Sequence, residues 1–433
     1  MRNGLCALWL AGGFALLARQ TATGDLPAKT SGCLLFLQTT KANMLMFDFV
    51  TGETPRLAVD QQGAGRDRDM IDLWKEAVVE SAALYIGWGG FLIGLVFGYI
   101  VFKTNFCTMG SISDILSFGD YRRFRSWLLA GAVAIIGVAV LQNLGIADMS
   151  QTMYLAPNLT WGANIVGGLM FGFGMVFAGG CLSRNLVRAG GGDLRSVMVL
   201  LITGIVSYMA IGGLIGPLRV ALFSAPTLDL TGMGLGSQGL GEILAALTSI
   251  SVATATLVSV VVVAGAIIVY CLMDAGFRSS GTHLAAGVGI GLCVVAGWML
   301  TGLAFDDFAD VPVQLISLSY VRPTGDTIDY AMRFTALGAP GFGVVTTIGA
   351  LLGGFLGAVS SGRFHLTTFA DTSDTLRNMF GAVLMGVGGV LALGCTVGQA
   401  MTGFSTLAVG SILTFVFIVL GGIAGIKTME AIA

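Results

Sequence analysis

"GGLMFGFGMVFAGGC" at Gly167–Cys181 and "GAVLMGVGGVLALGC" at Gly381–Cys395 follow one pattern. Their ungapped alignment is identical at Gly167/Gly381, Gly172/Gly386, Gly174/Gly388, Val176/Val390, Ala178/Ala392, Gly180/Gly394 and Cys181/Cys395. Both stretches are apolar and rich in glycine, and polar residues follow each final Gly-Cys pair. Glycine in membrane helices permits close backbone approach or marks a break in the helix. The repeat therefore predicts two related membrane helices, each of which breaks at a cysteine.

The composition of the chain is typical of a membrane protein. Of its 433 residues, 55% are hydrophobic and 11% are charged, whereas soluble domains have about 25% charged residues. The mean hydropathy is +0.86, and 65 residues are glycine. A formal net charge of −2 is too small to indicate a nucleic-acid partner. The sequence thus predicts an all-α polytopic membrane protein that resides in a lipid bilayer.

About nine apolar segments follow residue 80, and each is long enough to cross a hydrocarbon core that needs about 20 helical residues. They lie at 83–103, 126–146, 161–183, 197–216, 240–271, 283–303, 341–360, 379–401 and 405–426. The Gly-Cys pairs interrupt two of them before they leave the membrane. Exposed backbone at that depth is tolerated only where it lines a cavity or is buried in protein. We therefore expect short re-entrant helices beside the transmembrane segments.

Lysine and arginine are distributed unequally between the two alternating sets of loops. One set holds Lys103, Arg122, Arg123, Arg125, Arg184, Arg188, Arg195, Arg278, Arg363, Arg377 and Lys427. The other set holds Arg219, Arg322 and Arg333. Loops rich in lysine and arginine face the cytoplasm. This bias predicts a cytoplasmic C-terminus, with residue 80 on the outer side.

Five crossings separate the two Gly-Cys motifs, so the two copies run in opposite directions through the membrane. A weaker similarity links "GLVFGYIVFKTNFCTMG" (Gly94–Gly110) with "AGVGIGLCVVAGWMLTG" (Ala286–Gly302). Such an inverted-topology repeat places the substrate path near the midplane, at the interface of the repeats. The predicted organisation is a first repeat with a linker helix at 81–275 and a second, inverted repeat at 276–433.

Residues 1–80 differ in character from the rest of the chain. "GLCALWLAGGFALLA" (Gly4–Ala18) lies between Arg2 and Arg19, which fits a signal sequence or a short signal anchor. Translation could equally begin at Met44 or Met70, which would make this leader no part of the protein. Both interpretations remain open.

Three cysteines lie at predicted helix breaks: Cys107 in "NFCTMG", Cys181 in "GGCLSR" and Cys395 in "GCTVGQ". A helix end presents such a thiol to a cavity, so these three are the candidate lining of a substrate path. The other four cysteines, Cys6, Cys33, Cys271 and Cys293, lie in apolar or leader contexts, where free cysteine behaves as a small buried hydrophobe.

Other polar side chains near the breaks are candidates for the same path. Gln399 follows Cys395 by about one helical turn, and Thr396 and Thr108 could contribute hydroxyl groups. Arg184 and Arg188 follow Cys181 on one helical face, where we expect them to act as cytoplasmic anchors.

No metal site or cofactor is expected. The chain has no C-x-x-C pair and only two histidines, which argues against a zinc or cluster site. The phosphate-binding pattern G-x-x-x-x-G-K-[ST] does not occur in the sequence, so any energy from nucleotide hydrolysis would come from a partner.

Three motifs resemble signatures of the YeeE/YedE family of bacterial inner-membrane proteins. They are "FGYIVFKTNFCTMGSISD", "GGLMFGFGMVFAGGCLSRNLVRAGGG" and "GCTVGQAMTG", and the resemblance covers about residues 85–430. It implies thiosulfate uptake for sulfur assimilation, with relatives tied to other sulfur or selenium compounds. It also implies a helical fold in which short helices enter the bilayer and turn back.

The resemblance assigns roles to the cysteines and suggests a partner. Matched by motif, Cys107, Cys181 and Cys395 are implied to line a narrow path and to contact the substrate in turn, while half-helix ends offset the charge of the anion. A cytoplasmic sulfur-carrier protein, TusA-like, is suggested by the family alone.

Two alternatives to a thiosulfate transporter stay open. One is a transporter of another sulfur or selenium species, such as sulfite or a persulfide. The other is a membrane-embedded sulfurtransferase, which needs a thiolate and an activating neighbour. Only Cys181 has arginines nearby, and no histidine lies close in sequence to any of the three cysteines. A transporter, and not an enzyme, is therefore the expected function.

Overall fold

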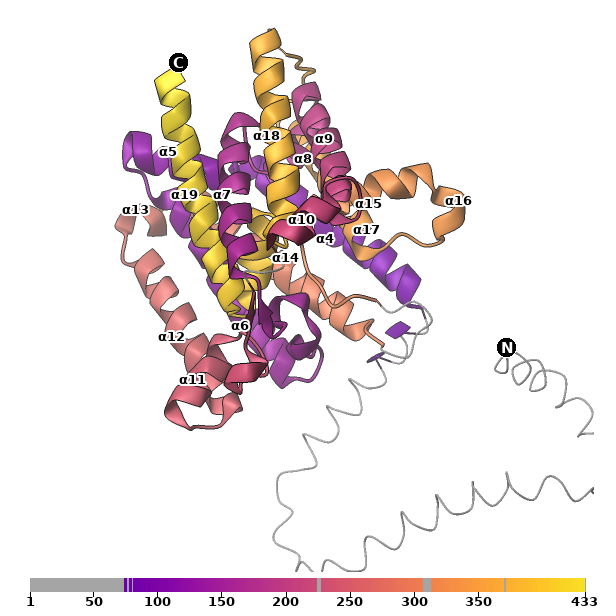
Figure 1. Ribbon diagram of the computed structural model, residues 1–433. Coiled ribbons are helices and arrows are strands. Elements are labelled where there is room, and N and C mark those ends of the chain that lie inside the picture. The colour runs from indigo at the N-terminus through magenta and orange to yellow at the C-terminus, as the bar shows by residue number, and fades with distance from the viewer. Residues whose placement is uncertain are drawn as a thin grey trace, which may run out of the picture. The chain divides into compact units, whose positions relative to one another are not determined.

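The computed structural model describes residues 74–75, 78–79, 81–223, 227–306, 313–369 and 371–432. Most of the predicted leader at 1–80, including Cys6 and Cys33, lies outside the described residues. The structure is helical almost throughout, which confirms the predicted all-α class (Figure 1).

The first half of the described chain forms nine α-helices. They are α4 (Ala82–Thr104), α5 (Thr108–Phe118), α6 (Arg122–Asn143), α7 (Trp161–Phe177), α8 (Leu182–Gly190), α9 (Leu194–Ile211), α10 (Gly216–Phe223), α11 (Leu240–Thr248) and α12 (Val252–Leu272). The loops between them hold the 3-10 turns η1 (Met149–Gln151), η2 (Met153–Leu155) and η3 (Thr231–Met233). Strand β1 (Asn158–Leu159) pairs antiparallel with β2 (Leu228–Asp229), with Asn158 opposite Asp229.

The second half of the described chain is also helical. It contains α13 (Ala275–Arg278), α14 (Gly281–Leu303), α15 (Val321–Met332), α16 (Phe334–Leu337), α17 (Phe342–Ser360), α18 (Thr372–Leu391), the π-helical turn η4 (Gly398–Gly403) and α19 (Val409–Ile432).

The described chain contains eight helical spans that are long and apolar enough to cross a membrane. They are Ala82–Phe118, Arg122–Asn143, Trp161–Gly190, Leu194–Ile211, Val252–Leu272, Gly281–Leu303, Phe342–Ser360 and Val409–Ile432. Helix α18 has 20 residues and corresponds to the predicted segment 379–401, but its first turns carry Asp374 and Arg377. The chain is thus a multi-pass membrane protein.

The predicted segment 240–271 is two helices instead of one. Ser249 adopts a left-handed φ of 57° and ends α11, and the Ser251 side chain caps α12 by accepting the N–H of Thr254. Helix α12 packs on α11 and α6, and it buries few of its own residues. The linker role that the sequence predicts for this segment stays a prediction.

Helices from the two halves pack in parallel pairs: α4 with α17, α6 with α14, α7 with α19, and α9 with α18. Successive contacts show the direction, since Gly94 faces Thr346 and Gly98 faces Ala350. Helices α7 and α18, which hold the two repeat motifs, pack against each other in opposite directions. Gly167 faces Leu391, and Gly381 faces Ala178.

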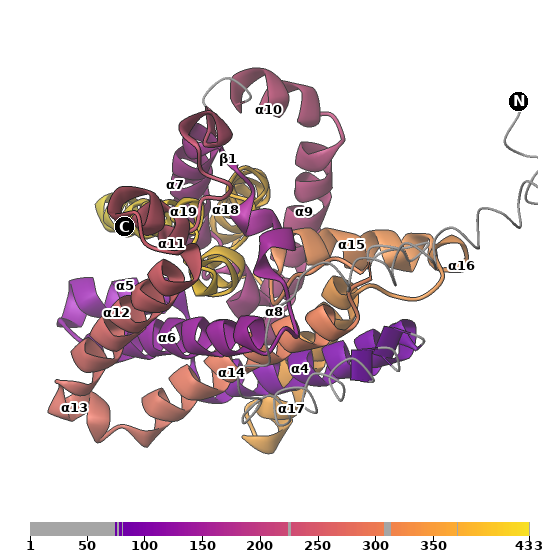
Figure 2. The same cartoon turned by 90° about the horizontal axis from the view of Figure 1, so that it is seen from below.

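The paired helices form two groups that are steeply inclined to each other. Figure 2 shows α18 and α19 nearly end-on, whereas α4, α6 and α14 lie lengthwise across the view. The short helix α8 packs on α4 and α17, and η4 packs on α6 and α14. The segments that follow the two Gly-Cys pairs therefore join the two groups.

Glycines set the distance between the paired helices. A Cβ atom at Gly98 would overlap the Ala350 carbonyl oxygen, and one at Gly353 would overlap the Leu95 carbonyl oxygen. Backbone therefore meets backbone along the contact of α4 with α17, as membrane helices with small residues at their interface permit.

We predict that Gly98→Ala destabilises the protein by about 1–3 kcal/mol, because overpacking forces these helices apart. The measurement is the thermal unfolding midpoint of the detergent-solubilised protein. Gly87→Ala on the same helix is the control, because a Cβ atom there meets nothing within 4 Å. Equal midpoints for the two variants would contradict the proposed role of the close contact.

Candidate functional site

Helices α7 and α18 end in the same backbone conformation. Gly179 has a φ of 71° and its counterpart Leu393 a φ of 56°, and the glycine that follows has a φ of 153° in one copy and 159° in the other. In both copies the N–H of that glycine donates to the carbonyl five residues earlier. Leucine in the left-handed region costs about 1 kcal/mol relative to glycine, so the surrounding structure imposes this turn on Leu393.

Each candidate cysteine lies immediately before a new helical segment. Cys107 is the N-cap of α5, and its sulfur accepts the N–H of Gly110 at 3.5 Å. Cys181 is the N-cap of α8. The sulfur of Cys395 accepts the N–H of Gly398 at 3.4 Å. The first N–H groups of a helix carry partial positive charge, so all three thiols lie in a field that attracts an anion.

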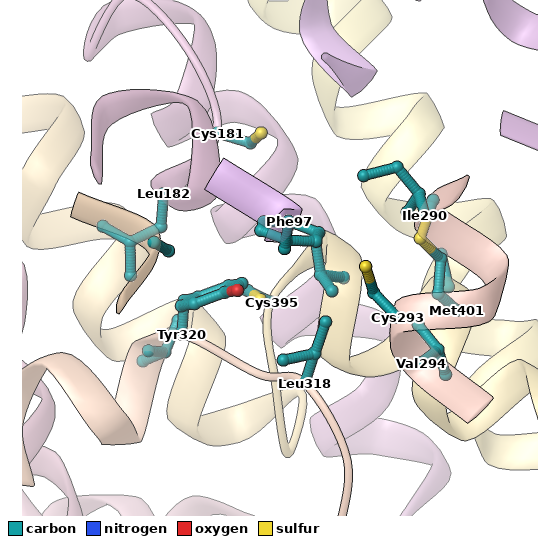
Figure 3. Close-up of a cluster of buried hydrophobic side chains, with 14 of the residues drawn as sticks. Phe97, Cys181, Leu182, Ile290, Cys293, Val294, Leu318, Tyr320, Cys395 and Met401 are labelled. Carbon is teal, nitrogen blue, oxygen red and sulfur yellow. The ribbon is translucent and has the colours of Figure 1, made fainter. Parts of the chain in front are cut away.

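The three thiols gather in one buried region. Cys107 lies beside Cys181, and Cys181 also neighbours the hydroxyl of Ser183 at 3.4 Å and the side chain of Thr396. Cys395 is within electrostatic range of Cys181. All three cysteines are buried. In the view of Figure 3, the fully buried ring of Phe97 lies between Cys181 and Cys395.

Two amide side chains close the helix breaks. Gln399 follows Cys395 by four residues, and its Nε2 donates to the carbonyl oxygen of Ala392. Asn185 follows Cys181 by four residues, and its Nδ2 donates to the Gly180 carbonyl oxygen at 2.9 Å. Both amides thus hydrogen-bond to backbone that the break has freed from helical pairing. One N–H of Gln399 is thus used at the break, while its Oε1 has no hydrogen-bond partner in the described part of the chain.

Asn185 is a site residue that the sequence reasoning missed. The signal was present, since Asn185 and Gln399 occupy the same offset in the two aligned motifs. Asn185 and Gln399 carry the same amide group, but on side chains of different length. Asn185 also accepts the hydroxyl of Ser196 at 2.9 Å, which ties the first break to α9.

Several buried oxygens beside the thiols lack hydrogen-bond partners within the described part of the chain. They are Thr108 Oγ1, Thr396 Oγ1, Gln399 Oε1 and the Tyr320 hydroxyl. Most buried polar groups in proteins are paired. This cluster therefore has unused hydrogen-bonding capacity, and it includes all three polar candidates from the sequence.

The arginines after Cys181 have partners in the structure. Arg184 donates to the Asn105 side chain at 3.0 Å, at the end of α4. Arg188 donates to the Gly179 carbonyl at 3.1 Å and forms an ion pair with Asp193. Besides the anchoring role predicted for them, both arginines therefore connect the first break to neighbouring segments: Arg184 to the end of α4, and Arg188 to Gly179 and Asp193.

Asp193 connects several of these groups. Its carboxylate pairs with Arg188 and Arg195 and caps α9 by accepting the N–H of Arg195. Burial raises the pKa of Asp193, but the two guanidinium groups outweigh it and leave the pKa below its usual value. The Ser196 hydroxyl lies within 3.4 Å of the same carboxylate, so the network reaches Asn185.

Within the described residues, no group of three or more histidine, cysteine, aspartate or glutamate side chains could hold a metal ion. The polar groups gathered at the site are thiols, hydroxyls, amide side chains and the backbone N–H groups at helix N-termini.

The amino-acid sequence of the chain is similar to those of known transport proteins. Residues 103–424 match a family described as sulphur transport. The thiosulfate transporter TsuA of Spirochaeta thermophila is 26% identical over 337 residues, covering 77% of this chain and 96% of that protein. TsuA of Escherichia coli is 25% identical over 348 residues, covering 77% and 91%. The probable transporter YedE of Salmonella typhimurium is 31% identical over 104 residues, 24% of each chain.

We predict that Asn185→Ala lowers the stability of the protein by about 1–3 kcal/mol, because buried carbonyl groups at the first break lose their donor. Thermal unfolding in detergent measures the effect. Asn143→Ala is the matched control, since that exposed amide donates to a carbonyl within its own helix. The interpretation fails if both variants unfold at the wild-type temperature.

A second prediction concerns pH. Because the pKa of folded Asp193 is below its unfolded value of about 3.9, its ionised form stabilises the protein above that pH. This contribution disappears as the pH falls through the folded pKa. The difference in unfolding midpoint between wild type and Asp193→Asn should therefore be large at pH 7 and shrink below about pH 4. A difference independent of pH would contradict the assignment.

Proposed function

The chain belongs to the sulphur transport family, and from this premise we propose that it imports thiosulfate, or a similar small sulfur anion, across the bacterial inner membrane. Two relatives that match most of the chain carry the name thiosulfate transporter. The observation that carries the proposal is the meeting of three buried thiols beside unpartnered oxygens. In this proposal Cys107, Cys181 and Cys395 contact the anion in turn.

The chemistry of the site suits passage of an anion better than its retention. A full cation at membrane depth would bind a dianion tightly and hold it. Helix N-termini supply partial positive charge without a cation. A thiol is a weak hydrogen-bond donor, and conduction requires sites that bind strongly enough to admit an ion and weakly enough to release it.

We further propose that 81–275 and 276–433 form an inverted repeat. The antiparallel packing of α7 on α18 supports this, as do the parallel pairs that each combine one helix from either half. The matching backbone at Gly179 and Leu393 supports it at the level of single residues. The bias of lysine and arginine between the loops supports a cytoplasmic C-terminus.

On this orientation, Arg184 and Arg188 mark the cytoplasmic end of the path, and Gln399 belongs to the outward-facing break. The anion thus meets Cys395 first and leaves past Cys181 and Cys107. A TusA-like sulfur carrier as the cytoplasmic acceptor completes the proposal, and the family resemblance is its support.

We predict that cells without other uptake routes grow on thiosulfate as sulfur source when they express this protein. Cys181→Ala or Cys395→Ala should abolish growth, because a thiol that contacts the anion is lost while the small, buried side chain remains apolar. Growth rate and the amount of protein in the membrane are the two measurements. Cys271→Ala is the control, because that thiol lies on α12 and donates to the Arg125 carbonyl.

Thiosulfate labelled separately at its two sulfur atoms distinguishes transport from sulfur transfer. A transporter delivers both sulfur atoms to the cytoplasm together, whereas a sulfurtransferase leaves sulfite outside. Uptake of both labels at equal rates supports the proposal, and external sulfite would replace it with the enzyme. Normal growth of the Cys181→Ala/Cys395→Ala double variant would end the role of the thiols.

A further inference from the structure

Tyr320 is a polar residue at the thiol site that the sequence reasoning did not single out. It is the N-cap of α15, and its side chain is fully buried. Its hydroxyl is among the buried oxygens that find no hydrogen-bond partner in the described structure. An aromatic ring retained only for packing needs no hydroxyl, and a buried unpaired hydroxyl lowers stability. Neither packing nor stability therefore explains the hydroxyl group at this position.

The place of Tyr320 in the fold is equivalent to that of Cys107. In the first half, Cys107 follows α4 and is the N-cap residue of α5. In the second half, Tyr320 lies between α14 and α15 and is the N-cap residue of α15. The neighbours correspond as well, since α5 packs on α19 and α15 packs on α9. Cys181 and Cys395 form the other equivalent pair. The site thus has four such positions, of which three hold a thiol and one a phenol.

The side chain of Tyr320 lies in the same buried region as the thiols. The backbone N–H of Tyr320 lies close to the sulfur of Cys395. Its hydroxyl is within electrostatic range of the Cys395 and Cys293 thiols. The ring packs on Phe97 with centroids 5.2 Å apart and planes tilted by 33°. Figure 3 shows the hydroxyl end of Tyr320 beside Cys395, with Phe97 next to both.

We propose that Tyr320 is the fourth substrate-contacting residue and that its hydroxyl donates a hydrogen bond to an oxygen of the anion beside Cys395. This inference rests on the proposed function and specifies its substrate class. A thiosulfate ion has one soft terminal sulfur and three oxygens that are strong acceptors. The thiols match the sulfur, and a phenol, which is a stronger donor than a thiol, matches an oxygen. Tyr320 thereby selects sulfur species that carry an oxyanion over those that have none.

The test is Tyr320→Phe, which removes only the hydroxyl and keeps the ring on Phe97. We expect the apparent KM for labelled thiosulfate to rise about tenfold or more, since a hydrogen bond to a charged group is lost. The unfolding midpoint should stay equal or rise, because an unpaired buried hydroxyl is gone. Tyr330→Phe is the control on the same helix, since the hydroxyl of Tyr330 donates to the Gly338 carbonyl at 3.0 Å; its KM should not change.

The outcomes separate this inference from the function on which it rests. If wild type imports thiosulfate and Tyr320→Phe imports it with the same KM, Tyr320 does not contact the substrate and the inference is overturned. A fall in unfolding midpoint together with an unchanged KM also overturns it, because the hydroxyl is then structural. If wild type itself neither imports nor binds thiosulfate, the proposed function fails first, and the inference fails with it.

Discussion

The structure depends on how two helices are broken inside a bilayer. Backbone groups freed at membrane depth find no water, so protein must satisfy them. Here Asn185 and Gln399 donate to the carbonyl groups that the breaks release, and the turns before them share one conformation. With these carbonyl groups satisfied, each cysteine lies at the N-terminus of the helical segment that follows its break, and the thiols are close together. The position of the thiols thus depends on the hydrogen bonds that satisfy the interrupted backbone.

The sequence predicts the fold class and most of the spans, because the length of an apolar segment and the charge of its flanking loops are local properties of the sequence. It merges α11 and α12 into one segment at 240–271, because Ser249 and Ser251 interrupt a run whose hydropathy barely changes. It does not indicate the partners of Gln399 and Arg184, the Ala392 carbonyl and the Asn105 side chain, because these contacts depend on three-dimensional packing.

The cysteines and threonines of the candidate site are accessible to sequence reasoning because polar residues interrupt apolar segments there. Tyr320 is not, because it follows a stretch without regular structure and has no sequence similarity to Cys107. Only the equivalent positions of α5 and α15 in the fold relate the two residues. Asn185 lies between these cases: extending the aligned repeat by four residues past its final cysteine places it opposite Gln399, which has a longer side chain.

The difference between Cys107 and Tyr320 has a thermodynamic consequence. A passage built from two equivalent halves would present the same sequence of affinities from either side, whereas unequal residues at equivalent positions make the wells along it unequal. Unequal wells alter the rate of passage in both directions by the same factor, since microscopic reversibility forbids a static asymmetry from choosing a direction. In the passage proposed for this protein, the direction of net flux is therefore set by the electrochemical gradient of the anion and by any process coupled to its movement.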